Sequence, residues 1–555
     1  MITNKLTPID RFWLLIKPDA SEIRNIYIYS FFNGLVNLSV PVGIQAIINL
    51  IQGGSISTSW IVLVAIVILG IALSGILQIS QLKITENLQQ KIFTRASFEF
   101  AYRIPRIRLE ALYKHYAPEL MNRFFDIVAI QKGLSKVLID FSTASIQTLF
   151  GLILLSLYHP FFIVYSLVLI ILIYSIFKFT AKKGLNTSLK ESKEKYAVAH
   201  WLEEVARTSV SFKLAGKTDL PMKRTNKLSG SYVNAREKHF KVLKQQYILM
   251  VVFKVLVAAG LLIVGSMLVM DQQMNIGQFV AAEIIILLVM GSVEKLILSL
   301  ETIYDILSSL EKVGQVTDLK LDSDSGIDIQ KTSKGLSIDI EDIDFSYPDQ
   351  TKRIFKSSSL KIESNERVMI IGDSDSGKTT LLYLITGLYR PQKGSIALNN
   401  LPIQNYNPEK LRSIIGDCLM DELLFEGTLL ENITMGRPNA TMENVMWAIE
   451  NLELQDFVKS LPLGLNTQFF PEGKQFSKGI IDKIILARSI ADKPKLLLIK
   501  DAFTSLVGEE RNRISDFILS KENNWTVVIA SRDEAIKAKV DRVIKTQNQS
   551  LIEIK

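Results

Sequence analysis

The sequence has 555 residues, 48% of them hydrophobic, and carries a formal net charge of +8 at pH 7. This length leaves room for several domains, and the single cysteine, Cys418, excludes an internal disulfide and a CxxC metal site. Only four histidines are present, scattered along the chain, which argues against a His-rich metal site. The excess of Lys and Arg suggests nucleic acid or a membrane as partner, and its distribution along the chain decides between them.

The first segment, Pro8–Arg24, mixes apolar and charged side chains. This mixture predicts a short interfacial helix on the cytosolic face of a membrane. A disordered tail is the alternative. Charges and prolines interrupt the segment before any long apolar run, so we do not expect a cleavable signal peptide.

Six apolar stretches follow, each long enough to cross a bilayer, which takes about 20 residues. They form three pairs, and the link inside each pair is short and contains neither Lys nor Arg. The pattern predicts an α-helical membrane domain with six transmembrane helices, near Ile26–Ile51, Trp60–Ile79, Leu138–Leu157, Phe161–Phe179, Tyr247–Met270 and Gly277–Leu298.

The links between the pairs, roughly Gln81–Val137 and Thr180–Gln246, are long and basic and contain few Gly or Pro residues. The positive-inside rule places both links and both termini in the cytosol. We expect the membrane that holds the spans to be the inner membrane of a bacterium. The same rule accounts for the basic excess, so we expect membrane lipid and no nucleic acid as a partner. We also expect the membrane helices to continue into the cytosol before they turn back.

Two ionisable residues fall inside the predicted spans. Lys254 lies about two turns from the cytosolic start of the fifth span, and Glu294 about as deep in the sixth. Burying one charge alone is costly, which favours a contact between the two residues or a wet inner cavity. The alternative is that both lie in water because the helices extend beyond the bilayer.

The stretch Gln315–Gly335 is polar and rich in Asp, Ser and Lys, which is typical of a linker. From Leu336 onward, short β-branched runs alternate with helical patterns. This alternation predicts a mainly parallel sheet surrounded by helices. The expected strands are Ser337–Ile343, Val368–Ile371, Gly394–Leu398, Lys495–Ile499 and Thr526–Ala530.

A P-loop sequence of the form GxxxxGK[ST], Gly372–Thr379, stands between an apolar strand and a helical segment. Such a loop wraps backbone amides around phosphate oxygens, and the helix N-terminus adds to the attraction. Lys378 is expected to reach the β- and γ-phosphates, and the Thr379 hydroxyl is expected to bind Mg²⁺. Asp373 and Asp375 are unusual because they place carboxylates in a loop that binds anions.

Six spans with long cytosolic loops, followed by a P-loop domain, resemble an ATP-binding cassette (ABC) exporter half-transporter over essentially the whole chain. The resemblance implies a type I exporter-like membrane domain of six helices joined to an α/β P-loop NTPase domain. It divides the chain into an interfacial segment, a transmembrane domain, a linker and a nucleotide-binding domain, at residues 1–24, 25–314, 315–335 and 336–555.

The motifs of this family can be followed through the second half. Phe345–Pro348 matches the adenine-stacking loop, Leu411–Ile433 the Q-loop region, Phe476–Ile480 the LSGGQ signature and Lys493–Ile499 the Walker B strand. The resemblance implies that ATP is the ligand, that Thr379 binds Mg²⁺, and that ATP is bound by Tyr347, Gly372, Asp373, Ser374, Asp375, Ser376, Gly377, Lys378, Thr379, Thr380, Ser477 and Gly479.

Several positions depart from the family's pattern. The Walker B aspartate, the catalytic glutamate, the switch histidine, the Q-loop glutamine and the D-loop aspartate are replaced, in this order, by Lys500, Asp501, Ser531, Met420 and Val507. Phosphoryl transfer depends on positioned charges, so these losses reduce the rate directly. The Asp501 carboxylate is about 1 Å or more too far from an attacking water, and small misplacements cost on the order of 100-fold in rate.

Lys500 puts a positive charge where the family holds Mg²⁺. We expect it to repel the metal and either to neutralise Asp373 or Asp375 or to lie against the phosphates. Nucleotide binding should then depend little on Mg²⁺. Asp501 and Ser531 remain the candidates for the catalytic positions.

These features predict an ATP-binding subunit of an exporter that moves a peptide, lipid or drug-like substrate out of the cytosol, with its own ATP site impaired. Nucleotide domains of the family pair head to tail, so the resemblance implies a second half-transporter, in a hetero- or homodimer, and the lost groups favour the heterodimer. The alternative is a membrane protein that binds ATP without turnover and has a regulatory or assembly role. By position, Ala117–Arg123 and Trp201–Thr208 are expected to rest on the nucleotide domain.

Overall fold

The structure is a computed structural model and describes residues 6–52, 58–329, 333–419 and 423–554. Two compact units make up the chain. The helical unit consists of Met1–Pro105 and His115–Leu319, and the sheet unit consists of Arg106–Lys114 and Lys320–Lys555. The turn expected between the first two spans falls on residues 53–57, outside the described residues.

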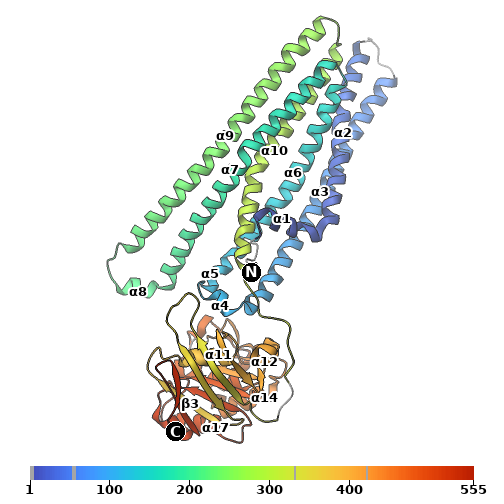
Figure 1. Ribbon diagram of the computed structural model, residues 1–555. Helices are drawn as coiled ribbons and strands as arrows, with labels where there is room; N and C mark the ends of the chain where they lie inside the picture. Colours follow the sequence, from blue (N-terminus) through green and yellow to red (C-terminus); the bar gives the residue numbers. More distant parts are fainter. Residues whose placement is uncertain (1–5, 53–57, 330–332, 420–422, 555) are drawn as a thin grey trace. The chain divides into compact units, whose positions relative to one another are not determined.

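Six long helices form the helical unit (Figure 1), and each is long and apolar enough to cross a membrane, which confirms the expected spans. The helices of 42 to 51 residues, α3, α7, α9 and α10, are about twice as long as a bilayer requires, so they extend beyond the predicted spans as expected. The six helices are α2 (Ala20–Gln52), α3 (Thr58–Arg103), α6 (Asp126–Ser156), α7 (Pro160–Arg207), α9 (Leu220–Met270) and α10 (Ile276–Thr317).

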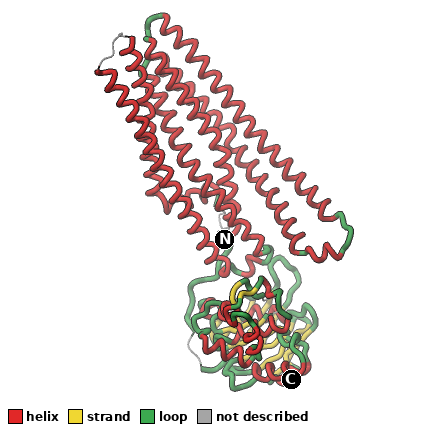
Figure 2. The backbone as a smooth tube through the Cα atoms, turned by 180° about the vertical axis from the view of Figure 1, so that it is seen from behind, coloured by secondary structure: helices red, strands yellow, loops and turns green. Residues whose placement is uncertain are grey.

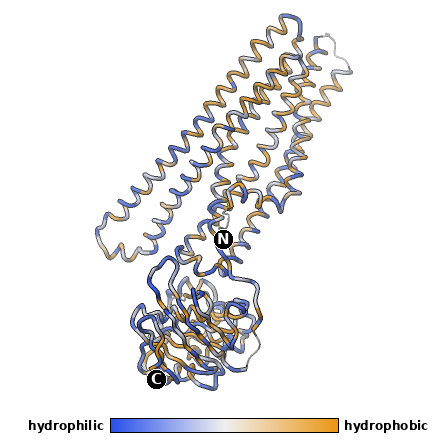
Figure 3. Tube along the Cα trace, viewed as in Figure 1, coloured by the Kyte–Doolittle hydropathy of each residue, from blue (hydrophilic) through white to orange (hydrophobic). Residues whose placement is uncertain are grey.

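Within this unit α2 packs along α3, α7 along α9, and α6 along α10 (Figure 2). Hydrophobic residues predominate along much of the long helices, whereas the ends of α7 and α9 near α8 (Ser209–Leu214) are hydrophilic (Figure 3). The Lys254 ammonium lies 2.6 Å from a Glu294 carboxylate oxygen, which confirms the expected contact between α9 and α10. The N-terminal segment forms α1 (Pro8–Ile16), which packs against α10.

The sheet unit contains a six-stranded sheet in the order β12-β11-β3-β10-β9-β6. Every strand in it is parallel to its neighbours except β12, and a second, four-stranded sheet in the order β2-β1-β4-β5 is antiparallel. The first sheet consists of β3 (Arg367–Gly372), β6 (Ile415–Cys418), β9 (Leu496–Lys500), β10 (Thr526–Ala530), β11 (Arg542–Gln547) and β12 (Ser550–Glu553), and the second of β1 (Ile338–Phe345), β2 (Phe355–Ile362), β4 (Lys393–Leu398) and β5 (Leu401–Pro402).

All five expected strands are present, but β1 and β4 belong to the antiparallel sheet rather than to the parallel one. Hydrophobic alternation identifies a strand but not the neighbour with which it pairs, which explains this error. The remaining strands are β7 (Gly427–Thr428) and β8 (Gln468–Phe469), and the helices are α11 (Lys378–Ile385), α12 (Pro408–Arg412), α13 (Leu429–Thr434), α14 (Met442–Asn451), α15 (Gln455–Ser460), α16 (Lys478–Ile490), α17 (Gly508–Leu519) and α18 (Glu534–Lys539).

The first basic link is divided between the two units. Its segment Arg106–Lys114, with the short helix α4 (Leu109–Leu112), folds with the sheet unit. Ala117–Arg123, which we expected to meet the nucleotide domain, belongs to the helical unit, where Arg123 pairs with Glu119 at 2.7 Å. The contact of Ala117–Arg123 with the nucleotide domain stays a prediction, whereas Arg106–Lys114 is the segment of this link that folds with the sheet unit.

Candidate functional site

Three neighbouring parallel strands of the sheet unit end at one edge. Ala530 of β10 lies opposite Ile370 of β3 on one side and opposite Lys500 of β9 on the other. Ligands of such sheets bind in the crevice outside the carboxyl ends of the strands. The three segments that meet at this edge are the P-loop after β3, Lys500–Asp501 at the end of β9, and Ser531–Arg532 after β10.

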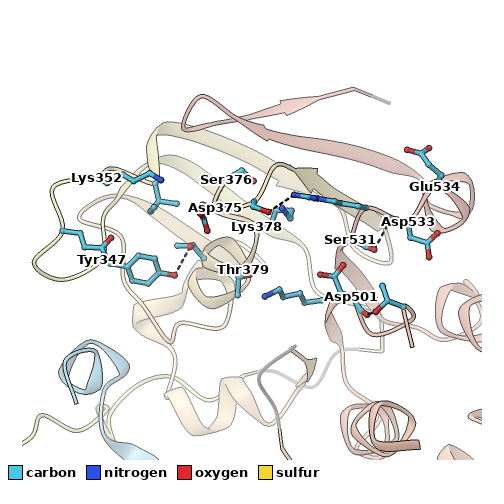
Figure 4. Close-up of a pocket in the computed structure, with 18 of the residues that line it drawn as sticks. Tyr347, Lys352, Asp375, Ser376, Lys378, Thr379, Asp501, Ser531, Asp533 and Glu534 are labelled. Carbon is cyan, nitrogen blue, oxygen red and sulfur yellow. Dashed lines mark hydrogen bonds between the residues drawn. The ribbon is translucent and has the colours of Figure 1, made fainter. Parts of the chain in front are cut away.

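A cavity of about 1110 Å³ opens at this edge (Figure 4). Tyr347 lies at one end of it, Asp501 and Ser531 lie at the other, and the P-loop side chains lie between them. The structure thus brings together most of the residues that the sequence singled out, since the lining includes Tyr347, Ser374, Asp375, Ser376, Gly377, Lys378, Thr379, Thr380, Lys500, Asp501 and Ser531.

Two glycines shape the P-loop. Gly372 has φ 155°, and a Cβ atom there would lie 2.2 Å from the Thr546 hydroxyl oxygen. Gly377 has φ 100°, and a Cβ atom there would lie 2.7 Å from Ile354 Cγ2. Both positions therefore require glycine. Helix α11 begins at the next residue, so its free N-terminal amides follow the loop directly.

The Lys378 ammonium folds over the loop and donates hydrogen bonds to the carbonyl oxygens of Gly372 at 2.8 Å and Asp373 at 2.7 Å. Burial, followed by the positive charge of Arg532, lowers the pKa of Lys378 below its usual value. Ser376 is tied to the neighbouring strand because its hydroxyl lies 2.6 Å from that of Thr546. These contacts hold the loop in a curved conformation, and the Lys378 side chain borders the cavity.

Tyr347 is held rigidly at its end of the cavity. Its hydroxyl lies 2.9 Å from that of Thr380, and burial raises its pKa. The rings of Phe345 and Tyr389 pack edge-on to it, with centroids 5.2 and 5.3 Å away. Through this contact Thr380 positions Tyr347, while the expected contact of Thr380 with a nucleotide stays a prediction.

The two positions that the family resemblance assigns to catalysis are at the other end. Asp501 adopts φ 51°, a conformation that Asp tolerates better than most residues, and its backbone amide donates to Ala530 O at 3.1 Å. Ser531 is 3% exposed, and its hydroxyl accepts a hydrogen bond from the Asp533 amide at 3.3 Å. Neither side chain reproduces the glutamate or the imidazole of the family.

Lys500 lines the cavity beside Asp501. In the described part of the chain it forms no ion pair with Asp373 or Asp375, so the expected neutralisation of those carboxylates is not observed. No group of three or more His, Cys, Asp or Glu side chains that could hold a metal occurs among the described residues. The oxygen atoms that this chain offers to a metal here are the Thr379 hydroxyl and the Asp501 carboxylate. The positive charge of Lys500 lies in the same cavity lining, so these residues fit Mg²⁺ poorly.

Arg532 is a candidate binding residue that sequence reasoning missed. Its guanidinium donates to the Ser374 hydroxyl at 3.2 Å and to Gly372 O at 3.3 Å, so it clamps the P-loop from the end of β10. Its position directly after the replaced histidine, at the carboxyl end of a strand, was a signal that could have identified it. Lys352 and Arg511 also line the cavity, but they lie in segments without a comparable sequence signal.

The signature residues lie elsewhere in the sheet unit. Ser477 is at the N-cap position of α16, without a capping hydrogen bond from its side chain, Gly479 lies in the first turn, and neither lines the cavity. Lys478 pairs with Asp482 at 2.6 Å. Val507, at the D-loop position, is 75% exposed, and Met420, at the Q-loop position, lies outside the described residues.

Comparison with known proteins agrees with the fold of both units. Residues 23–293 match the family described as ABC transporter transmembrane region, and residues 355–504 match the family described as ABC transporter. In fold, the chain is similar to a bacterial Atm1-family ABC exporter solved with ATP bound, with a TM-score of 0.81, 17% identity and coverage of 96% of this chain and 94% of that one.

Two curated relatives match this chain over part of their length. The "Putative multidrug export ATP-binding/permease protein" of Staphylococcus aureus is 32% identical over 244 residues, 43% of this chain and 42% of that protein. The ABC transporter B family member 21 of Arabidopsis thaliana is 34% identical over 203 residues, 36% of this chain and 16% of that protein. The match thus spans less than half the length of either relative. With a transporter membrane domain and an ATP-binding domain fused in one polypeptide, this chain belongs to the ABC transporter family.

Proposed function

We propose that this chain is the ATP-binding subunit of an exporter that moves a peptide, lipid or drug-like substrate out of the cytosol, and that its own ATP site hydrolyses ATP poorly. The observation that carries the proposal is the pairing of an intact P-loop with a catalytic end that holds Lys500, Asp501 and Ser531. The proposed domains are an interfacial segment, a transmembrane domain, a linker and a nucleotide-binding domain, at residues 1–24, 25–314, 315–335 and 336–555.

ATP fits the residues at this edge. The loop amides, the N-terminus of α11 and the Lys378 ammonium suit a triphosphate, and the Tyr347 ring suits an adenine. The proposed ATP contacts are Tyr347, the loop residues Gly372–Thr379 and Thr380, while Ser477 and Gly479 serve a partner's site. A nucleotide bound here would be held by Lys378, Lys500 and Arg532 rather than through Mg²⁺.

The proposed orientation places the basic links, both termini and the sheet unit in the cytosol of a bacterium, because Lys and Arg concentrate in those links. The proposed partner is a second half-transporter with a complete catalytic set. Such a partner would hydrolyse ATP at its own P-loop while this chain supplies Ser477 and Gly479. A heterodimer of this kind needs no catalytic activity from Asp501.

The ATPase rate of the purified chain, alone and mixed with a half-transporter encoded beside it, tests this proposal. We expect the chain alone to release phosphate at background and the mixture to turn over. Replacing the partner's catalytic glutamate should abolish that activity, whereas Asp501→Asn in this chain should leave at least about half of it, because this site contributes little. A full rate from the chain alone would reject the asymmetric arrangement, and no turnover in any mixture would reject transport driven by hydrolysis.

A further inference from the structure

The first basic link contributes an aromatic ring to the nucleotide site. Tyr113 follows α4 and lies with the rest of Arg106–Lys114 in the sheet unit. Its ring stacks on the ring of Tyr347, with centroids 5.4 Å apart and planes inclined by 13°. Both rings line the cavity that contains the P-loop side chains. A residue more than 200 positions before Tyr347 thus reaches the base end of the site.

Tyr347 is the fixed member of this pair. Its hydroxyl contacts Thr380, and the rings of Phe345 and Tyr389 pack edge-on against it from the buried core of the unit. Of the aromatic contacts that Tyr347 makes among the described residues, the one with Tyr113 is the one with nearly parallel rings. Tyr113 therefore covers a face of Tyr347 in the way that a nucleobase would.

Tyr113 is the more exposed member. The residue is 37% exposed, and its hydroxyl accepts one hydrogen bond, from the Gln350 side-chain amide at 2.5 Å. The start of the same segment is anchored by the backbone instead, because the Asp322 amide donates to Arg106 O at 2.8 Å and Ile107 forms a β-bridge with Leu321. The ring can therefore leave Tyr347 while the segment stays attached to the sheet unit.

We propose that Tyr113 competes with the nucleobase for the face of Tyr347 that it covers, so that base binding expels the Tyr113 ring. The proposal rests on the proposed function, since it requires a nucleotide at this site. Rings stacked at this spacing leave no room for a third ring between them. The segment that carries Tyr113 follows α3 and precedes α5 (Ala117–Met121) in the sequence, so expulsion would signal base occupancy to the membrane helices.

Equilibrium binding of labelled ATP to the full chain in detergent tests the competition, with inorganic tripolyphosphate as a ligand that lacks a base. Tyr113→Ala should tighten ATP binding by about 3- to 10-fold, because the site no longer spends part of its time covered by a ring. The affinity for tripolyphosphate should stay the same, because that ligand does not reach Tyr347.

Two variants serve as controls. Tyr113→Phe keeps the stack but loses the hydrogen bond from Gln350, so its affinity for ATP should lie between those of the wild type and Tyr113→Ala. Tyr116→Ala removes a tyrosine that lies in the helical unit, and its affinity should equal that of the wild type. Weaker ATP binding by Tyr113→Ala would show that the two rings sandwich the base, and unchanged binding would show that the stack is incidental. Either result overturns the competition while the proposed function stands. Absence of ATP binding in every variant, the wild type included, would overturn both.

Discussion

Replacing Lys378 by alanine is expected to lower the affinity of the chain for ATP by about 100-fold or more, since charge-assisted hydrogen bonds contribute roughly 1.5–3 kcal/mol each and this ammonium is placed to make two. In the structure the ammonium already donates two bonds, to Gly372 O and Asp373 O, so it has the reach and geometry to bind two phosphate oxygens instead. Equilibrium dialysis with labelled ATP measures the effect.

The matched control is Lys361→Ala, which removes an exposed lysine that pairs with Glu363 at 2.9 Å on the same unit. Its effect on ATP binding should be less than about twofold, since an exposed ion pair of this kind contributes little. If Lys378→Ala and Lys361→Ala bind ATP equally well, the nucleotide is not held by the P-loop.

The second large effect concerns Mg²⁺. Removing the metal with EDTA should change the affinity of the wild-type chain for ATP by less than about threefold, because Lys500 supplies a positive charge where a metal would be repelled. Lys500→Asp should bind ATP at least about 10-fold more tightly with Mg²⁺ than with EDTA, since it restores an oxygen ligand and removes the repulsion. Titration calorimetry in both buffers gives the four affinities.

Lys500→Ala separates the effect of removing the lysine charge from the effect of adding an oxygen ligand. It removes the lysine charge without adding an oxygen ligand, so its preference for Mg²⁺ should lie between those of the wild type and Lys500→Asp. A wild-type chain that binds ATP only with Mg²⁺ would show that the phosphates and Thr379 hold the metal in spite of Lys500. The charge at this position would then have no effect on the metal.

The membrane half and the P-loop could be predicted because their physics is local. A run of apolar residues identifies a membrane helix, and a glycine pattern such as Gly372–Thr379 specifies a loop conformation without reference to the rest of the chain. The grouping of Asp501 and Ser531 with that loop was implied by the family resemblance, and the common edge at which the parallel strands end explains it.

What the sequence did not reveal depends on contacts between distant segments. No local pattern indicates that Tyr113 stacks on Tyr347, or that Arg106–Lys114 folds with the sheet unit. The membership of β1 in an antiparallel sheet was missed for the same reason, since alternation specifies which face of a strand is buried and not its partner. Arg532 is different, because its place beside Ser531 made its role accessible from the sequence.

We propose that this chain holds ATP but hydrolyses it poorly without a partner. Measuring retained labelled ATP and released phosphate in one sample of the purified chain, with Mg²⁺ and with EDTA, tests it most directly. We predict that ATP is retained by most molecules in both buffers and that phosphate release stays at background over the time in which an active ABC exporter completes about 100 turnovers, at the roughly 1–10³ s⁻¹ typical of enzymes. Failure to retain ATP, or Mg²⁺-dependent release at such a rate from the chain alone, would contradict the claim.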